Sequence, residues 1–326
     1  MKLLVRVPFS DEKVNELKQY FDEIIVDSWT KTGERYYEDE MLKVLKEVKP
    51  DAIITELDRI TEKVLSGYDG LKFIGDCRAT PANIEIDACD RHGVPVLCTP
   101  GRNTQAVAEM VVGLLLCFMR NIISANKWEM EGKWVQGTTP YYLHMGNELN
   151  RKKVGLVGMG QIARVVAKIL EAFGCDIYFY DPFVKNADPK YHQVDLDKLF
   201  EISDIVSIHV PPMESTRGMI TESLFKKMKK TAIFVNAARS MIIDSKALYN
   251  AIESKSIAGA IIDVLDNEPP TEDDLKIGKF SNVLMVPHIC GATYEVSDHQ
   301  ADIIVERIHK WFKKEDMDKI VYNLKK

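Results

Sequence analysis

The stretch KKVGLVGMGQIARVV, Lys152–Val166, passes from a short apolar segment through a glycine-rich turn into a helical pattern. In the turn, Gly158 permits a tight reversal, Gly160 lets the backbone approach a pyrophosphate, and Ala163 allows a helix to pack closely on a strand. A helix that begins near Gln161 would point unpaired N–H groups at bound phosphates. Such a turn is by itself also compatible with a purely structural role, so the neighbouring segments decide its meaning.

The strand pattern that follows the turn ends in an acidic residue. CDIYFYDP, Cys175–Pro182, places Asp181 21 residues after Gly160. A carboxylate at this point accepts hydrogen bonds from the ribose hydroxyls of adenosine and repels a 2′-phosphate. Turn, helix, strand and acid together predict a dinucleotide-binding site and favour NAD over NADP.

Strand and helix patterns alternate on both sides of this site. The apolar segments KLLVRVPF, EIIVDSW, DAIITE, LKFIGDC and VPVLCT precede it, and a second alternation runs from Lys152 to VLMVPHI at 283–289. This spacing predicts parallel sheets with helices on both faces. We therefore expect an α/β protein with two doubly wound parallel-sheet domains. They are a flavodoxin-like substrate-binding domain, 1–100 completed by 291–326, and an inserted Rossmann NAD-binding domain, 101–290.

Two segments after residue 100 do not fit the alternation. Residues 103–127 are predicted to form one long helix that is apolar on all sides, which indicates burial between domains or at an oligomer interface. Residues 128–150 are aromatic and irregular and are expected to form an arm. The arm would close over the substrate, cap a pocket of a partner subunit, or pack at a dimer interface.

Composition excludes several classes of function. The 326 residues are 46% hydrophobic and 28% charged, with a formal net charge of −6, and long Lys/Arg runs are absent from the sequence. Such a chain is a poor binder of nucleic acid or of anionic membranes. The N-terminus lacks a secretory signal pattern, and the most apolar window, 111–119, is too short to span a bilayer. Six scattered cysteines without a CxxC motif predict a cytoplasmic protein with reduced thiols and no metal site.

Three later segments place reactive side chains just past predicted strands. Arg239 lies in TAIFVNAARSMIID, Asp263 and Glu268 in GAIIDVLDNEPP, and His288 in NVLMVPHICGAT. Ligands of open α/β sheets bind beyond the carboxyl ends of the strands, so we expect these groups to face one crevice. Singly, each has an ordinary explanation: a surface charge, a turn residue or a satisfied histidine.

As a set, a guanidinium, a carboxylate and an imidazole suit hydride transfer to a 2-keto acid. The planar, permanently charged fork of Arg239 can hold the substrate carboxylate and polarise the carbonyl group. His288 can give a proton to the carbonyl oxygen as hydride arrives and take it back in oxidation. A neighbouring carboxylate favours the protonated imidazole and orients the ring.

The dinucleotide turn with Asp181, then VNAARSMIIDSKAL, DVLDNEP and PHICGAT, resemble the NAD-dependent D-2-hydroxyacid dehydrogenases, in particular the phosphoglycerate dehydrogenase-like branch. The resemblance covers nearly the whole chain. It implies that Arg239, Glu268 and His288 are catalytic and that NAD is the cofactor. It also implies a 2-keto or D-2-hydroxy acid as substrate, with phosphorylated acids, glyoxylate and hydroxypyruvate as candidates. The implied assembly is a homodimer joined through 103–150.

The resemblance further implies a cofactor site. Backbone around His209, Val210 and Pro211 would line the adenine side, and Asp263 would hold the nicotinamide carboxamide. The other implied cofactor residues are Gly158, Gly160, Gln161, Ile162, Asp181, Ala237 and His288. Two departures from the family pattern, Ala163 and Ser240 in place of glycine, keep a small side chain.

The substrate loop departs further. CRATPAN, Cys77–Asn83, stands where relatives often have a glycine-rich G-T-G-x-D-N. By analogy, backbone N–H groups near Ala79 and Thr80 would cradle the substrate carboxylate, with Arg239 as its cation. If Arg78 and Arg102 also face the substrate, it would carry a second anion. The alternative for each arginine is a structural ion pair.

Two rival functions fit parts of the pattern. A nonenzymatic NAD(H)-sensing regulatory protein of the same fold would keep the same site, although the acidic charge and the lack of an appended docking segment argue against it. A formate dehydrogenase would place Gln where Glu268 stands.

Overall fold

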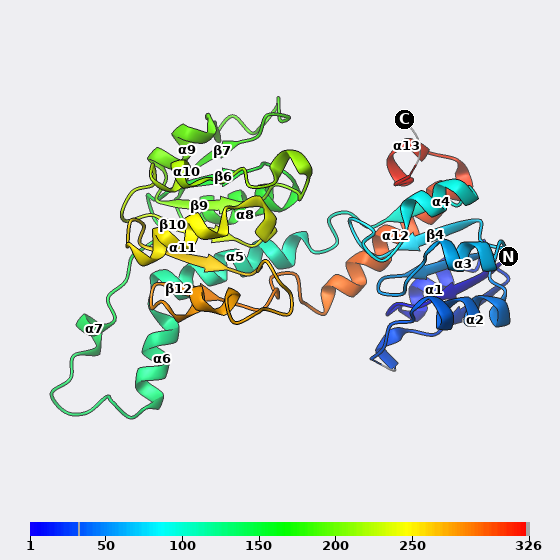
Figure 1. The fold of residues 1–326 in the computed structure, drawn as a ribbon, viewed down its shortest axis with the longest axis horizontal. Coiled ribbons are helices and arrows are strands. Elements are labelled where there is room, and N and C mark those ends of the chain that lie inside the picture. The colour runs from blue at the N-terminus through cyan, green and yellow to red at the C-terminus, as the bar shows by residue number, and fades with distance from the viewer. Residues whose placement is uncertain (32, 324–326) are drawn as a thin grey trace. The chain divides into compact units, whose positions relative to one another are not determined.

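The computed structural model describes residues 1–31 and 33–323, which separate into two compact units (Figure 1). Unit 1 comprises Met1–Asn103 and the chain from Thr293 onward, and unit 2 comprises Thr104–Ala292. The predicted segment 291–326 ends in three residues that lie outside the described ones.

Unit 1 contains a five-stranded parallel sheet with the order β2-β1-β3-β4-β5. β3, β4 and β5 are buried at every residue, as expected for a parallel sheet covered on both faces. The strands are β1 Lys2–Val5, β2 Glu23–Val26, β3 Ala52–Thr55, β4 Phe73–Asp76 and β5 Val96–Cys98. The helices are α1 Asp11–Leu17, α2 Glu38–Val48, α3 Glu62–Gly67, α4 Ile86–His92, α12 Glu295–Lys313 and α13 Met317–Ile320.

Successive strand residues point to opposite faces of this sheet, and each face has its own core. Leu3 belongs to the core that includes Ile304 of α12, whereas the next residue, Leu4, belongs to the core that includes Met41 of α2. Gly75 of β4 leaves room for α12, because a Cβ there would lie 3.1 Å from the Ile304 side chain. A helix late in the chain therefore completes a sheet formed by the first hundred residues.

Unit 2 contains a seven-stranded parallel sheet with the order β12-β11-β10-β9-β6-β7-β8. Helices α5 and α8 pack on one face, and α9, α10 and α11 pack on the other. The strands are β6 Lys153–Val157, β7 Asp176–Tyr180, β8 His192–Gln193, β9 Ile205–Ile208, β10 Ile233–Asn236, β11 Gly259–Ile262 and β12 Val283–Met285. The helices after β6 are α8 Gln161–Ala172, α9 Leu196–Ile202, α10 Glu222–Phe225 and α11 Ser245–Glu253, and the helices α5, α6 and α7 come before β6. The predicted fold class is confirmed.

The prediction of one long helix over 103–127 is wrong. The chain forms α5, Thr104–Met119, and α6, Ile122–Met130, which meet at 60°. Asn121 between them has a left-handed φ of 55°, a conformation that asparagine tolerates better than most residues and that a continuous helix does not contain. α5 is buried along most of its length and α6 has no buried residue, so the break separates a core helix from an exposed one.

Within the described part of the chain, no one helix combines the length and the apolar character that a membrane span requires. α5 and α6 reach that threshold only when counted together across their bend.

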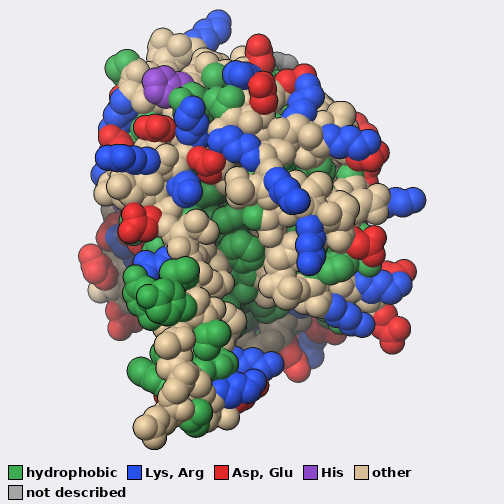
Figure 2. Space-filling view, turned by 90° about the vertical axis from the view of Figure 1, so that its left-hand side faces the viewer, with side chains coloured by type: hydrophobic (Ala, Val, Ile, Leu, Met, Phe, Trp, Pro, Cys, Tyr) green, Lys and Arg blue, Asp and Glu red, His purple; other side chains and the backbone are tan. Residues whose placement is uncertain are grey.

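The predicted arm begins in α6 and contains one further short helix, α7, Pro140–Leu143. Most of its large apolar side chains face solvent, and Leu149 at its end is buried: Met130 is 78% exposed, Trp134 63% and Tyr141 77%. Figure 2 shows hydrophobic side chains on the projection at the bottom of that view, the level at which α6 and α7 lie in Figure 1. The arm therefore presents an apolar surface rather than a buried one.

Candidate active site

The glycine turn joins β6 to α8 and makes different demands on its two glycines. Gly158 has φ +95°, and a Cβ there would lie 2.9 Å from the carbonyl group of His209. Gly160 faces open space, with no atom within 4 Å of its Cβ position, and it directly precedes α8. The open surface at Gly160 and the free N–H groups at Gln161 and Ile162 therefore fit a pyrophosphate.

Asp181 follows β7 and is tied to this turn. Its Oδ2 accepts a hydrogen bond from the N–H of Met159 at 2.8 Å, and its Oδ1 accepts one from Phe183 at 2.9 Å. Each oxygen keeps a further lone pair, and the side chain is half-buried. The carboxylate is thus fixed beside the turn, as ribose recognition requires.

The segment after β9 lies next to the same turn. His209 Nε2 is 2.9 Å from the hydroxyl oxygen of Ser207, and burial lowers the pKa of His209 to about 4. Its imidazole is therefore neutral at physiological pH. Val210 is half-buried and Pro211 is exposed. Ala237 follows β10, is half-buried, and packs against the core on the sheet face that α5 and α8 cover.

Glu268 and His288 form a contact pair. They follow neighbouring strands, β11 and β12, and His288 Nδ1 lies 2.7 Å from Glu268 Oε2. The His288 side chain is 40% exposed, and the Glu268 side chain is 44% exposed. Because a carboxylate only accepts, Nδ1 is the donor, and Nε2 stays open, with no partner found among the described residues.

Asp263 holds the turn that carries His288. It is buried, and its two carboxylate oxygens accept hydrogen bonds from the N–H groups of Ile289 at 2.7 Å and Cys290 at 3.1 Å. His288 itself has a left-handed φ of 54°, which is costly for a residue with a Cβ. The two hydrogen bonds hold the turn in this conformation.

A cavity of about 350 Å³ lies beside the contact pair in unit 2. Its walls are mainly apolar, with Leu265, Leu275 and Met285 next to Glu268 and His288. The cavity thus places an apolar wall beside the half-exposed imidazole and carboxylate.

Arg239 follows β10 and is exposed. Its Nη1 donates to the carbonyl oxygen of Ala238 at 2.6 Å, and its own carbonyl oxygen accepts from Asn236 Nδ2 at 3.1 Å. The structure brings Glu268 and His288 into contact, but it gives Arg239 no direct contact with either of them among the described residues.

The other predicted substrate residues lie in unit 1, on the loops after β4 and β5. Arg102 pairs with Glu56 at 3.3 Å and donates to Gln300 Oε1 at 3.0 Å, which matches the structural alternative for this residue. Arg78 donates through Nε to the carbonyl oxygen of Glu56 at 2.6 Å and forms no ion pair within the described residues. Ala79 and Thr80 are exposed.

Two features of unit 1 escaped the sequence analysis. Asp76, the last residue of β4, is fully buried, and neither carboxylate oxygen has a hydrogen-bond partner among the described residues. Burial raises the pKa of Asp76 to about 7, an effect that the nearby Arg78 only partly opposes. The second feature is a buried ion pair of Arg6 with Asp58. Charged residues that directly end or follow buried strands are the signal that would have found both.

Among the described residues, no group of three or more His, Cys, Asp or Glu side chains is arranged to hold a metal ion.

Comparisons with known proteins place the chain in a family. The family model described as "D-isomer specific 2-hydroxyacid dehydrogenase, NAD binding domain" matches residues 112–290. "Putative 2-hydroxyacid dehydrogenase YoaD" of Bacillus subtilis (strain 168) is 40% identical over 312 residues, 95% of this chain and 91% of that protein. "Glyoxylate reductase" of Thermofilum pendens (strain DSM 2475 / Hrk 5) is 37% identical over 300 residues, 90% and 86% of the two chains. A solved structure, acyclic imino acid reductase (Bsp5) in complex with NADPH and D-Arg, has a TM-score of 0.80 at 26% identity and covers 98% of this chain and 99% of its own.

The chain belongs to the D-isomer specific 2-hydroxyacid dehydrogenase family. It is an NAD-dependent oxidoreductase that interconverts 2-keto acids and D-2-hydroxy acids. The predicted family, enzyme class and cofactor are confirmed, and no comparison supports the nonenzymatic alternative.

Proposed function

We propose that His288, Glu268 and Arg239 perform the proton transfer and carboxylate binding that accompany hydride transfer in this enzyme. The observation that carries the proposal is the 2.7 Å contact between His288 Nδ1 and Glu268 Oε2. It assigns one ring nitrogen to the carboxylate and leaves the other for the substrate.

His288 acts as general acid in the reduction of the keto acid. Glu268 accepts from Nδ1 and stabilises the charged imidazole, so the proton exchanged with the substrate is the one on Nε2. As the keto carbon gains hydride, Nε2 passes its proton to the keto oxygen, and the product is the hydroxy acid. In oxidation the neutral Nε2 takes the hydroxyl proton back.

Arg239 binds the substrate carboxylate. One guanidinium nitrogen is used on the carbonyl oxygen of Ala238, and the remaining N–H groups of the exposed fork can make a two-point contact with a carboxylate.

When bound, NADH supplies the hydride and NAD accepts it. The N–H groups of Gln161 and Ile162, next to Gly160, would hold the pyrophosphate, and Asp181 would accept hydrogen bonds from the ribose hydroxyls. Backbone at His209, Val210 and Pro211 would line the adenine side, and Ala237 and Asp263 would lie on the nicotinamide side. The fixed charge of Asp181 repels a 2′-phosphate, so NADH is preferred to NADPH.

The substrate is a small 2-keto acid. The relative named glyoxylate reductase supports small acids of this class. Arg78, which forms no ion pair among the described residues, favours an acid with a second polar or anionic group, such as hydroxypyruvate or a phosphorylated analogue. Arg102 contributes less charge, because Glu56 neutralises it.

The enzyme is a homodimer in a reducing, cytoplasmic environment. The apolar arm with Trp134 and Tyr141 is too exposed for an isolated subunit and fits a second copy of the chain. The cysteines are all free thiols, and most are buried, as in proteins of reducing compartments.

The test is NADH oxidation against a panel of 2-keto acids: glyoxylate, hydroxypyruvate, pyruvate, 3-phosphohydroxypyruvate and branched-chain acids. Wild type is run beside His288→Ala, Glu268→Gln and Arg239→Lys, with NADPH in place of NADH as a parallel series. We expect His288→Ala to lower kcat by roughly 100-fold or more, and Arg239→Lys to act mainly on KM for the acid.

Undiminished turnover in His288→Ala would refute the assigned roles while leaving the family membership intact. Tight NADH binding without turnover of any acid would favour the sensing role instead. Equal turnover with NADPH would contradict the role given to Asp181.

A further inference from the structure

We propose that Asp58 is a positioning residue for the substrate-binding side chains of unit 1, an inference that rests on the proposed function. Through its buried ion pair with Arg6, Asp58 fixes the segment Glu56–Ile60. That segment in turn orients Arg78 and the substrate loop that ends at Asn83.

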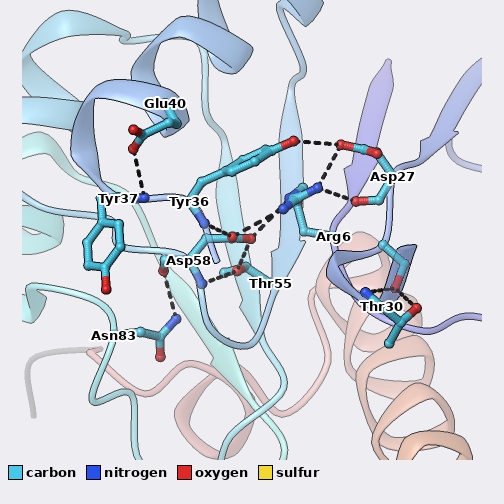
Figure 3. A network of polar contacts seen from close by, with 10 residues as sticks. Arg6, Asp27, Thr30, Tyr36, Tyr37, Glu40, Thr55, Asp58 and Asn83 are labelled. Atoms are coloured by element: carbon cyan, nitrogen blue, oxygen red, sulfur yellow. Dashed lines mark hydrogen bonds and ion pairs between the residues drawn. The ribbon is translucent and has the colours of Figure 1, made fainter. Parts of the chain in front are cut away.

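The carboxylate of Asp58 is fully buried and surrounded by donors (Figure 3). Arg6 donates through Nε to Oδ2 at 3.2 Å and through Nη2 to Oδ1 at 3.4 Å. The Thr55 hydroxyl donates to Oδ2 at 2.9 Å, and the N–H of Tyr36 donates to Oδ1 at 2.8 Å. Because these donors come from separate parts of the chain, they hold Asp58 in one position.

Arg6 lies where open sheets usually bind a ligand. The strand order of unit 1 reverses between β1 and β3, and ligands of such sheets bind beyond the carboxyl ends of the strands at this switch point. Arg6 directly follows β1 and is fully buried. Its Nη1 donates to the carbonyl and carboxylate oxygens of Asp27 at 2.5 and 2.6 Å, and its Cζ is 3.7 Å from the centre of the Tyr36 ring. Contacts with Asp27, Asp58 and Tyr36 thus hold the side chain, which serves as an anchor.

Glu56, two residues before Asp58, orients both arginines of the proposed substrate site. Its carbonyl oxygen accepts from Arg78 Nε at 2.6 Å, and its carboxylate lies 3.3 Å from Arg102 Nη1. Any shift of this segment would therefore turn both guanidinium groups.

The same segment holds the end of the substrate loop. Asn83 Nδ2 donates to the carbonyl oxygen of Asp58 at 3.1 Å, as Figure 3 shows. The N–H of Ile60 donates to the carbonyl oxygen of Asn83 at 3.1 Å, and the carbonyl oxygen of Ile60 accepts from Glu85 at 2.8 Å. At the other end of the loop, the N–H of Cys77 donates to the carbonyl oxygen of Thr55 at 2.8 Å. Both ends of the loop are fixed to residues 55–60.

A buried ion pair is an expensive way to stabilise a fold, because both charges lose their hydration. A pair of apolar side chains would fill the same space at lower cost. The ion pair adds geometric precision, because a planar guanidinium group binds a carboxylate in a fixed orientation. Here that precision is applied at a segment that touches Arg78, Arg102 and Asn83.

The test compares Asp58→Asn with Asp27→Asn. Both remove a carboxylate charge from Arg6 while keeping side-chain size, but only Asp58 belongs to the segment that contacts the substrate residues. We expect Asp58→Asn to raise KM for the preferred 2-keto acid roughly tenfold, with kcat and the Kd for NADH changed less than about twofold. Asp27→Asn is expected to leave all three within about twofold of wild type.

A second variant tests the same proposal if Asp58→Asn fails to fold. Thr55→Val removes the hydroxyl that donates to Asp58 Oδ2 and leaves the ion pair intact, so it should raise KM in the same direction by a smaller factor. Hydrogen–deuterium exchange of the peptide covering 77–85 is measured on all variants without substrate. Faster exchange is expected in Asp58→Asn and Thr55→Val, and wild-type exchange in Asp27→Asn.

The exchange result does not need turnover, so it decides the proposal even if no 2-keto acid proves to be a substrate. Equal effects of Asp58→Asn and Asp27→Asn on KM and on exchange would overturn the positioning role and leave a purely structural network. Altered KM in Asp58→Asn with unchanged exchange of 77–85 would overturn it as well.

Discussion

Gly158 and Gly160 stand two residues apart, and the structure constrains them in different ways. Gly158 needs a left-handed φ and has a backbone carbonyl 2.9 Å from its Cβ position, whereas Gly160 faces open space in an ordinary conformation. We predict that Gly158→Ala lowers the free energy of unfolding by roughly 1–3 kcal/mol. Gly160→Ala should fold like wild type and weaken NADH binding, because the Cβ stands where the pyrophosphate approaches.

Urea unfolding and NADH fluorescence titration of the two variants separate these effects. Gly160→Ala is the matched control for Gly158→Ala, since it makes the same chemical change in the same turn. Equal losses of stability in both would contradict the different constraints on the two glycines, and unchanged NADH binding in Gly160→Ala would contradict the assignment of the open surface to the cofactor.

Asp76 gives unit 1 a pH dependence of its own. Its pKa is raised from an ordinary value of 3.8 to about 7, so between these values the folded protein keeps a proton that the unfolded chain has lost. The free energy of unfolding therefore falls as pH rises through this window, by at most about 1.4 kcal/mol for each pH unit, and levels off above about pH 7.

We predict that Asp76→Asn removes this dependence. Relative to wild type, the variant should gain stability steadily from pH 4 to pH 7 and then keep a constant advantage. Urea unfolding at half-unit pH intervals measures the difference. A difference that does not change with pH would show that Asp76 ionises normally in the folded protein.

At the scale of elements, the turn after β12 is the strained piece of the site. His288 keeps its left-handed φ because the Asp263 carboxylate accepts hydrogen bonds from the N–H groups of the next two residues, Ile289 and Cys290. Asp263→Asn turns one acceptor oxygen into a donor and leaves one N–H unpaired. We predict a roughly 10- to 100-fold lower kcat, with the Kd for NADH changed by less than about threefold.

Stopped-flow turnover together with NADH titration checks this prediction, and Asp263→Glu serves as the conservative comparison. A large rise in the Kd for NADH with little loss of kcat would favour the carboxamide contact over the role in the turn.

The elements themselves were largely readable from sequence, because parallel strands appear as short apolar runs between helical patterns. The break between α5 and α6 was not, since residues 103–127 keep their apolar character through Asn121 and only the backbone angle there ends the helix. Glu268 and His288 were expected to face one crevice because each follows a predicted strand, and the family resemblance singled out Glu268 as the carboxylate. The partners of Arg6 were not, because Asp27 and Asp58 lie 21 and 52 residues away and no local pattern joins them.

At the scale of the whole molecule, the exposed arm predicts the state of assembly. Trp134 and Tyr141 are large apolar groups on a segment that buries none of them within the chain. We predict that wild type elutes as a dimer and that the double variant Trp134→Glu, Tyr141→Glu is a monomer, because charges in an apolar interface remain unpaired.

Light scattering after gel filtration measures both masses. Circular dichroism of the double variant should match wild type, since α6 and α7 contribute no buried residue to the core. A monomeric wild type would leave the arm to another role, such as closure over the substrate.

The division of unit 1 between the two ends of the chain affects how the protein is made. Its five strands are complete at Cys98, yet the core on one sheet face needs Ile304 and Ile308 of α12, which a ribosome translates about 200 residues later. Unit 2 is one continuous stretch and can finish folding as it emerges. Until α12 is synthesised, α1 with Leu17 therefore covers only part of that face, and the rest of its apolar surface stays exposed in the nascent chain.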